Sequence, residues 1–328
     1  QPERLLELER AHALVVPGEA GVHEQTVEVA TGGARAYVTP RRLTVVVDDV
    51  PAKSADVDEE RKGPRVGAPD AAVQGFLKAA GLASLDQASV VDDAKKGSYY
   101  VARISRPGRT AAAILEDVIP DIVGKFPWPK SMRQGTSKLR WVRPLQAVLC
   151  LFDGRPVRLT IDGVDSVETT RGHRFLSPRP FVVTDFSSYD RGLADAHVIL
   201  DPQERADRIA DDARDIAEQH GLELIEDAGL LAENAGLVEW PSVMMGSFDK
   251  SFLEVPAEVL TTAMKAHQKC FSLRDPETGK LANRFLLVSN ASPRDGGKTI
   301  IAGNEKVIRA RLADAKFFWE LDRKKPLD

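Results

Sequence analysis

Segments with strand patterns and segments with helix patterns follow one another irregularly along this chain of 328 residues, and this order limits its fold. β-rich stretches predict strands around residues 34–50 and 285–290. Apolar residues at helical spacing predict helices over 68–82, 202–220 and 256–268. A parallel α/β sheet requires regular alternation, so the sequence predicts an α+β fold with mixed or antiparallel sheets and packed helices.

The clearest helix is predicted over residues 202–220. Asp201 is suited to cap it, Pro202 to open it and Gly221 to end it, and Glu204 would complete a capping box. The residues at helical spacing that should form its apolar face are Ala206, Ile209, Ala210, Ala213, Ile216 and Ala217.

Two hairpins and a broken helix are predicted before residue 164. Residues 97–110 should turn at Pro107-Gly108, and residues 145–163 should turn at Asp153-Gly154, a favoured two-residue turn. The strand before Asp153 is apolar on both faces, which predicts a central strand covered on each side. Between the hairpins, Pro120 should kink or interrupt a helix.

The length of the chain exceeds what one simple core requires, so we expect two parts: an N-terminal α+β subdomain over 1–110 and a body over 111–328, with a helical insertion near 172–237. No apolar run approaches the roughly 18 residues of a membrane span, and no signal peptide is visible. Cys150 and Cys270 are isolated and lie in apolar settings. They are typical of buried thiols in a reducing cytoplasm.

Familiar catalytic motifs are missing from the sequence. It has no P-loop, no GxGxxG after a strand, no HExxH and no Cys/His set with metal spacing, so we expect no metal or cofactor in this chain. His173 and His267 are the only histidines in dense polar surroundings, and a lone histidine is more commonly structural. A Cys270–His267 nucleophile is weakly supported, because the pair straddles a predicted helix end.

Positive charge is concentrated in one interval of the sequence. Residues 122–152 contain six Lys or Arg residues and no acid, with Trp128 and Trp141 among them. Cations beside aromatic rings suit phosphate and base contacts in RNA, although a solvated loop with core aromatics fits the same pattern. The string RGHRF adds Arg171 and Arg174, and its Gly172 indicates a tight turn or a close backbone approach.

The segment 303–325 combines an apolar face with a basic one. Helical spacing places Ile308, Leu312, Ala315 and Trp319 together. The cations Lys306, Arg309, Lys316 and Arg323 form a basic stripe beside that face. Asp314 and Glu320 could pair with some of them. A salt-bridged surface helix and an RNA-binding helix are both open on these residues alone.

The string GNEKVIRARLADAKFFWELDRKKPL resembles the signature of the β subunit of bacterial glycyl-tRNA synthetases. Further strings are similar to blocks of that family in the same order along nearly the whole chain. They include TPRRL (39–43), KGSYYVARI (96–104), PKSMR (129–133), WVRPLQAVLCLFD (141–153), RGHRFL (171–176), VEWPSVMMGSF (238–248) and FLEVPAEVLTTAMKAHQKCF (252–271).

The chain departs from that family in two places. The family opens with a strand ending in Gly-Thr-Glu-Glu-Leu-Pro, which is not found before Gln1, and it has Trp where Gln134 stands. The family also continues into an HD-type helical domain and an anticodon-binding domain. The resemblance therefore implies an N-terminal fragment, with a fold similar to the B3/B4 region of phenylalanyl-tRNA synthetase β chains.

The resemblance also implies a function. A non-catalytic β subunit would support binding of tRNA(Gly) and assembly of an α2β2 enzyme in the cytoplasm, while the α subunit would bind ATP and Mg for glycylation. A scaffold contacting only the α subunit, and an editing hydrolase of mischarged tRNA using His173 or His267, are the alternatives. The RNA-binding residues expected are Lys130, Arg133, Arg140, Arg143, Arg171, Arg174, Lys306, Arg309, Lys316 and Arg323.

Overall fold

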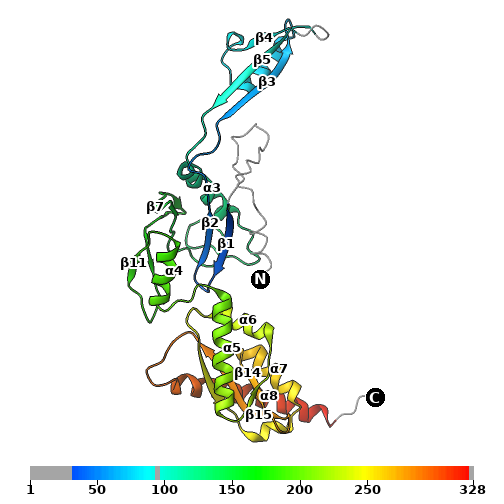
Figure 1. The fold of residues 1–328 in the computed structure, drawn as a ribbon. Helices are drawn as coiled ribbons and strands as arrows, with labels where there is room; N and C mark the ends of the chain where they lie inside the picture. The colour runs from blue at the N-terminus through cyan, green and yellow to red at the C-terminus, as the bar shows by residue number, and fades with distance from the viewer. Residues whose placement is uncertain (1–31, 93–96, 325–328) are drawn as a thin grey trace. The chain divides into compact units, whose positions relative to one another are not determined.

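The computed structural model describes residues 32–92 and 97–324. The fold is α+β, with helices and small, mainly antiparallel sheets (Figure 1). The described residues fall into two compact units, one within residues 1–35 and 47–168 and the other within residues 36–46 and 169–328. Strands β1 (Gly33–Val38) and β2 (Leu43–Asp48) pair with each other, and the limit between the units falls within each of them. The predicted division into an N-terminal subdomain over 1–110 and a body over 111–328, with a helical insertion near 172–237, stays a prediction.

The first unit contains a three-stranded antiparallel sheet with the order β3-β5-β4. Helix α2 packs on it, begins after Pro69 and ends at Gly81, whose φ of 66° fits a left-handed C-cap, so the predicted helix is confirmed. The core here contains Phe76, Leu77, Ala102 and Ile104. The elements are β3 (Val57–Arg65), α2 (Asp70–Ala80), a 3₁₀ turn (Leu85–Gln87), β4 (Ser89–Val91) and β5 (Tyr99–Arg106).

The hairpin predicted to turn at Pro107-Gly108 is wrong. Residues 99–106 form one strand, and the chain continues past Gly108 alongside residues 52–54 instead of turning back. A Cβ on Gly108 would lie 1.8 Å from the carbonyl oxygen of Ser54. The glycine is therefore explained by a close backbone approach.

Helix α3 (Ala111–Lys125) runs through Pro120 without a break, so of the predicted kink or interruption the interruption is wrong and the kink stays a prediction. Thr110 caps this helix by accepting a hydrogen bond of 3.3 Å from the amide of Ala113. The helix places Leu115, Ile119 and Val123 against a core of Val157, Leu159 and Ile161. Because this packing stabilises the helix on both sides of the proline, the lost backbone hydrogen bond does not end it.

The predicted turn at Asp153-Gly154 is confirmed, because both residues have positive φ, as a type I′ turn requires. The predicted central strand is wrong. β6 and β7 are two residues long and form a sheet of their own, and Pro156 has no N–H with which to extend the ladder. Val148, Cys150 and Phe152 still pack on the neighbouring core. The short strands are β6 (Leu151–Phe152), β7 (Arg155–Pro156), β8 (Thr160–Ile161) and β9 (Val164–Asp165).

The second unit is built around an antiparallel sheet with the order β12-β14-β15-β13. Leu286 of β15 faces a core shared with α5 and α6, whereas Phe285 and Leu287 face a core shared with α7 and α8. β15 is therefore the doubly covered central strand, and helices lie on both faces of this sheet.

Paired strands and a helix precede this sheet within the second unit: β10 (Thr169–Arg171), β11 (Pro180–Val182) and α4 (Phe186–Asp195). The sheet and the elements around it are α5 (Pro202–Gln219), β12 (Glu223–Leu224), α6 (Ala228–Leu237), β13 (Ser242–Ser247), a 3₁₀ turn (Lys250–Glu254), α7 (Ala257–Gln268), β14 (Phe271–Arg274), β15 (Leu281–Ser289) and α8 (Lys298–Asp322).

Helix α5 confirms the predicted span and its apolar face. Asp201 caps it through the amide of Gln203, at 2.7 Å, and not through the third-residue amide that a capping box uses. Gly221 follows the helix with a φ of 65°. The sequence did not predict that Arg205, on the same face, would be completely buried.

Candidate nucleic-acid interface

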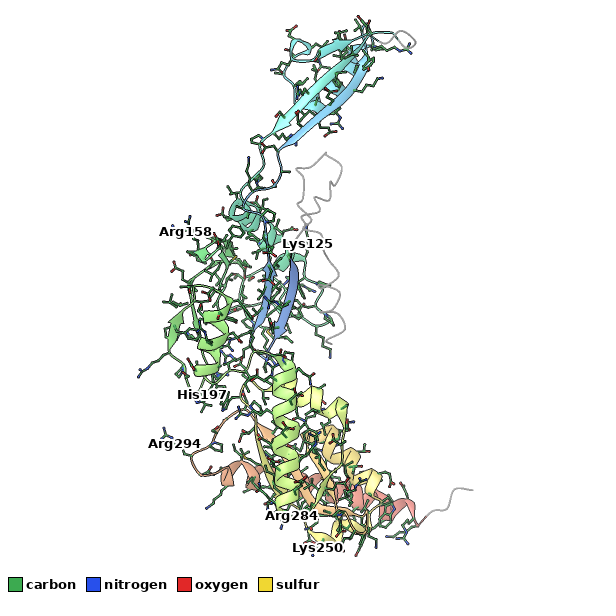
Figure 2. The ribbon with its side chains drawn as sticks, viewed as in Figure 1. Lys125, Arg158, His197, Lys250, Arg284 and Arg294 are labelled. Atoms are coloured by element: carbon green, nitrogen blue, oxygen red, sulfur yellow. The ribbon has the colours of Figure 1, made fainter. Side chains whose placement is uncertain are left out.

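In the first unit, the acid-free interval begins at the end of α3, where Lys125 is labelled in Figure 2. Three aromatic rings hold the loop that follows. The ring of Trp128 lies 4.7 Å from Phe126 and 4.9 Å from Trp141, the latter edge-on. Met132 and Trp141 also exchange backbone hydrogen bonds. The two tryptophans are therefore mainly anchors for this loop, which is the core-aromatic interpretation of the sequence pattern.

The cations of this loop point into solvent. Lys130, Arg133, Lys138, Arg140 and Arg143 are all exposed. None of them makes an ion pair with another described residue, whereas Lys125 pairs with Asp121 at 2.8 Å. These five cations, without an ion-pair partner in the described ranges, form a local positive surface on a loop held by aromatic packing, although the whole chain has a net charge of −4.

In the second unit, the string RGHRF forms the start of a loop that joins β10 to β11. The loop covers residues 172–179, and its last paired residues are Arg171 and Pro180. His173 is fully buried, and its Nδ1 accepts hydrogen bonds from the amides of Phe175 (3.4 Å) and Leu176 (3.2 Å). Arg174 and Phe175 extend outward from this buried histidine.

A buried polar network lies beneath this loop, and it joins three strings that resemble family blocks. Glu239, from VEWP, is fully buried and accepts a hydrogen bond of 2.7 Å from the hydroxyl of Thr39, from TPRRL. Arg42 forms an ion pair with the same Glu239 oxygen. Its guanidinium also donates to the carbonyls of Arg171 and Gly172, so the network holds the base of the RGHRF loop.

Arg205 supports the same region from α5. Its guanidinium donates to the carbonyls of Ile199, Leu200 and Ala235, each at 2.8 Å, and to that of Val38 at 2.7 Å. Burial lowers the pKa of Arg205, while the Glu239 carboxylate opposes that shift. Arg205 lies four residues before the buried Ile209 and therefore on the same face of α5. This spacing is the signal that could have predicted the burial of Arg205.

Helix α8 has the apolar anchors that the sequence predicted. Ile308 and Leu312 are fully buried, and Trp319 packs against the same core. Phe317 and Phe318 are each 61% exposed.

The four cations of the α8 stripe differ in their surroundings. Lys316 donates to Glu254 at 2.9 Å, and this hydrogen bond raises the pKa of the ammonium group. Arg323 lies over the ring of Trp319 at 4.8 Å. Lys306 and Arg309 are exposed and make no ion pair with another described residue. The two latter residues are the part of the stripe most open to a phosphate.

Lys130, Arg133, Arg140 and Arg143 belong to the first compact unit, whereas the α8 stripe and the RGHRF loop belong to the second. Their common role in RNA binding, which is expected from the sequence, therefore stays a prediction. The residues that the sequence analysis missed are Thr39, Arg42, Arg205 and Glu239, which position the loop, and Phe175 at its tip.

The structure gives little support to a hydrolytic site. The Nε2 of His173 is buried without a hydrogen-bond partner among the described residues, and His267 is exposed on α7. Burial raises the pKa of Cys270 to about 12, so its thiol is a poor nucleophile at neutral pH. Both cysteines are free; Cys270 is buried, as predicted, whereas Cys150 is only partly buried. The described residues include no metal-binding group of His, Cys, Asp or Glu, and no helix among them could cross a bilayer.

Comparisons with known proteins agree with the resemblance in the sequence. A family model described as "Glycyl-tRNA synthetase beta subunit" matches residues 18–328. The chain is 53% identical over 294 residues to the glycine--tRNA ligase beta subunit of Ruegeria sp. (strain TM1040). The alignment covers 88% of this chain and 42% of that relative.

A second relative is the glycine--tRNA ligase beta subunit of Phenylobacterium zucineum (strain HLK1), at 49% identity over 295 residues. That alignment covers 90% of this chain and 43% of the relative, so the chain spans less than half the length of the curated relatives it matches. The agreement of a family model over most of the chain with two close relatives leads to one conclusion: the chain belongs to the glycyl-tRNA synthetase beta subunit family.

Proposed function

We propose that this chain is part of a non-catalytic β subunit that binds tRNA(Gly) and assembles with the catalytic α subunit of a cytoplasmic α2β2 glycyl-tRNA synthetase. ATP and Mg would bind the α subunit. The B3/B4-like fold belongs to the same proposal. The observation that carries tRNA binding is the set of exposed cations in the loop that follows α3, which make no ion pair within the described part of the chain. Phosphate neutralisation by such residues supplies sequence-independent affinity for nucleic acid.

The test uses the complete β subunit together with its α partner. The double variant Arg133→Ala/Arg140→Ala removes two of these cations. The control Arg155→Ala/Arg158→Ala removes two exposed cations from another part of the first unit (Arg158 is labelled in Figure 2). We expect the test variant to bind tRNA more weakly and to flatten the slope of log K against log salt by roughly one to two. An unchanged affinity and slope would show that these cations are only solvated.

Three further assays separate the alternatives. Pyrophosphate exchange with glycine should require the α subunit, and exchange by the β subunit alone would contradict a non-catalytic role. If a β-subunit variant that no longer binds tRNA still supports glycylation by the α subunit, and glycylation stops without any β subunit, the scaffold alternative would be favoured. Release of glycine or alanine from charged tRNA by the β subunit, lost in His173→Ala, would favour the editing hydrolase.

A further inference from the structure

The loop between β10 and β11 presents an aromatic ring to solvent. Phe175 is 70% exposed, the largest exposed fraction of any large apolar side chain in the described part of the chain. Burying a phenylalanine side chain is favourable, but folding of this chain leaves Phe175 exposed. The free energy of burying this ring is therefore available to a binding partner. An exposed ring of this kind suits a ligand with an apolar face.

The backbone that carries Phe175 is held from several directions. The amide of His173 donates to the carbonyl of Ala196, and the amide of Ser177 donates to the carbonyl of His173, both at 2.9 Å. A Cβ on Gly172 would lie 2.3 Å from that of Ala196, so the loop packs there as only glycine allows. With Arg42 bound to the loop carbonyls from below, the ring stands on a preorganised support, which lowers the entropy lost on binding.

The charged side chains of the loop itself are all positive. Residues 169–184 contain no acid, and Arg171, Arg174 and Arg179 are exposed. The guanidinium of Arg174 lies 4.9 Å from the centre of the Phe175 ring, a cation–π contact that leaves most of the ring open. Arg171 donates to the carbonyl of Pro178 and makes no ion pair with another described residue.

We propose that this loop binds an unpaired nucleotide of the tRNA, with the base stacked on Phe175 and Arg174 and the adjoining phosphates neutralised by Arg171 and Arg179. A base within a duplex has both faces covered by its neighbours, so a protruding ring has access only to unstacked bases. Stacking on an aromatic ring together with nearby cations is the usual means of binding single strands without base-specific hydrogen bonds. This inference rests on the proposed function, since it names the part of the RNA that the second unit would contact.

The experiment compares three RNAs on the complete αβ enzyme by fluorescence anisotropy: tRNA, a short single-stranded oligoadenylate, and a blunt RNA duplex of the same length. We expect Phe175→Ala to weaken oligoadenylate binding about tenfold or more, with duplex binding and the salt slope unchanged. Phe175→Trp should retain binding, because indole also stacks. Phe317→Ala, which removes a similarly exposed ring on α8, is the matched control and should change nothing.

The charge half of the proposal has its own measurement. Arg179→Ala should lower the salt slope for oligoadenylate by about 0.7, the value for one contact to a single strand. Equal losses for oligoadenylate and duplex in Phe175→Ala, or no loss for oligoadenylate, would overturn the proposal. Loss of α-subunit association with RNA binding intact would overturn it as well, and would assign the loop to a protein contact. If the unmodified enzyme bound no tRNA, that result would contradict the proposed function itself. Equal losses in Phe175→Ala, with tRNA binding by the unmodified enzyme intact, would contradict only the proposal for the loop.

Discussion

The hydroxyl of Thr39 donates a hydrogen bond of 2.7 Å to the buried carboxylate of Glu239, 200 residues further along the chain. Arg42 forms an ion pair with the same carboxylate oxygen and reaches the base of the RGHRF loop. Glu239 is thus the point at which the β1–β2 connection is joined to the rest of the second unit.

Glu239→Ala should destabilise the protein by about 3–5 kcal/mol, because it leaves the partly buried Arg42 without its counter-ion. Chemical denaturation followed by circular dichroism measures this loss as a lower midpoint. The control is Asp58→Ala, which breaks the exposed ion pair between Asp58 and Arg103. The control should move the midpoint much less, because surface pairs are screened by water. Equal shifts in the two variants would contradict a structural role for the buried network.

The α8 stripe should contribute less to RNA binding than its sequence suggests. Arg309→Ala/Lys316→Ala removes two cations, but Lys316 is paired with Glu254 and would have to leave that carboxylate to reach a phosphate. We therefore expect the salt slope of tRNA binding to fall by about one, through Arg309. Arg311→Ala, on the other side of the helix, serves as the control. An unchanged slope in the double variant would make the stripe a solvated face, and lost glycylation with intact tRNA binding would indicate an α-subunit contact.

Leu312→Ala should cost about 2–5 kcal/mol, because it opens a cavity between α8 and the sheet, where Leu312 is fully buried. Phe317→Ala on the same helix should stay within about 0.5 kcal/mol, because that ring is mainly exposed. Thermal or urea unfolding of the two variants gives the comparison. A large loss in Phe317→Ala would show that its ring is packed in solution.

The two thiols should be unreactive in the native protein at neutral pH. Burial raises the pKa of Cys150 to about 11 and that of Cys270 to about 12. A pKa raised on folding stabilises the native state fully below the unfolded pKa, near 8.5, and the contribution is lost as pH rises toward the folded values. Native labelling with a thiol reagent at pH 7 should be slow and should become fast in denaturant. Rapid labelling of Cys270 without unfolding would contradict this burial.

Local signals were sufficient for elements that depend on neighbouring residues. Helix α5 has a capping carboxylate at Asp201, a proline at its start and Gly221 after its end, and each is interpretable without the rest of the chain. The turn at Asp153-Gly154 is of the same kind. The anchors of α8 were also predictable, because Ile308 and Leu312 follow helical spacing.

The misses have physical causes. Pro107-Gly108 suits a turn, but it equally suits a backbone pressed against Ser54, and only the tertiary structure decides between them. The burial of Arg205 has only its helical spacing as a signal in the sequence, because arginine is counted as polar and two of its four carbonyl partners, those of Ala235 and Val38, are distant in sequence. Glu239 has no local signature at all, since its partners Thr39 and Arg42 lie about 200 residues away.

The division of the second unit between residues 36–46 and 169–328 has a consequence for synthesis of the protein. Thr39 and Arg42 leave the ribosome long before Glu239 is translated. At about 5–20 residues per second, the intervening 200 residues take roughly 10–40 s. During that time Thr39 and Arg42 of the nascent β1–β2 segment lack their partner Glu239. Chaperone binding to the growing chain should therefore be strongest in this interval.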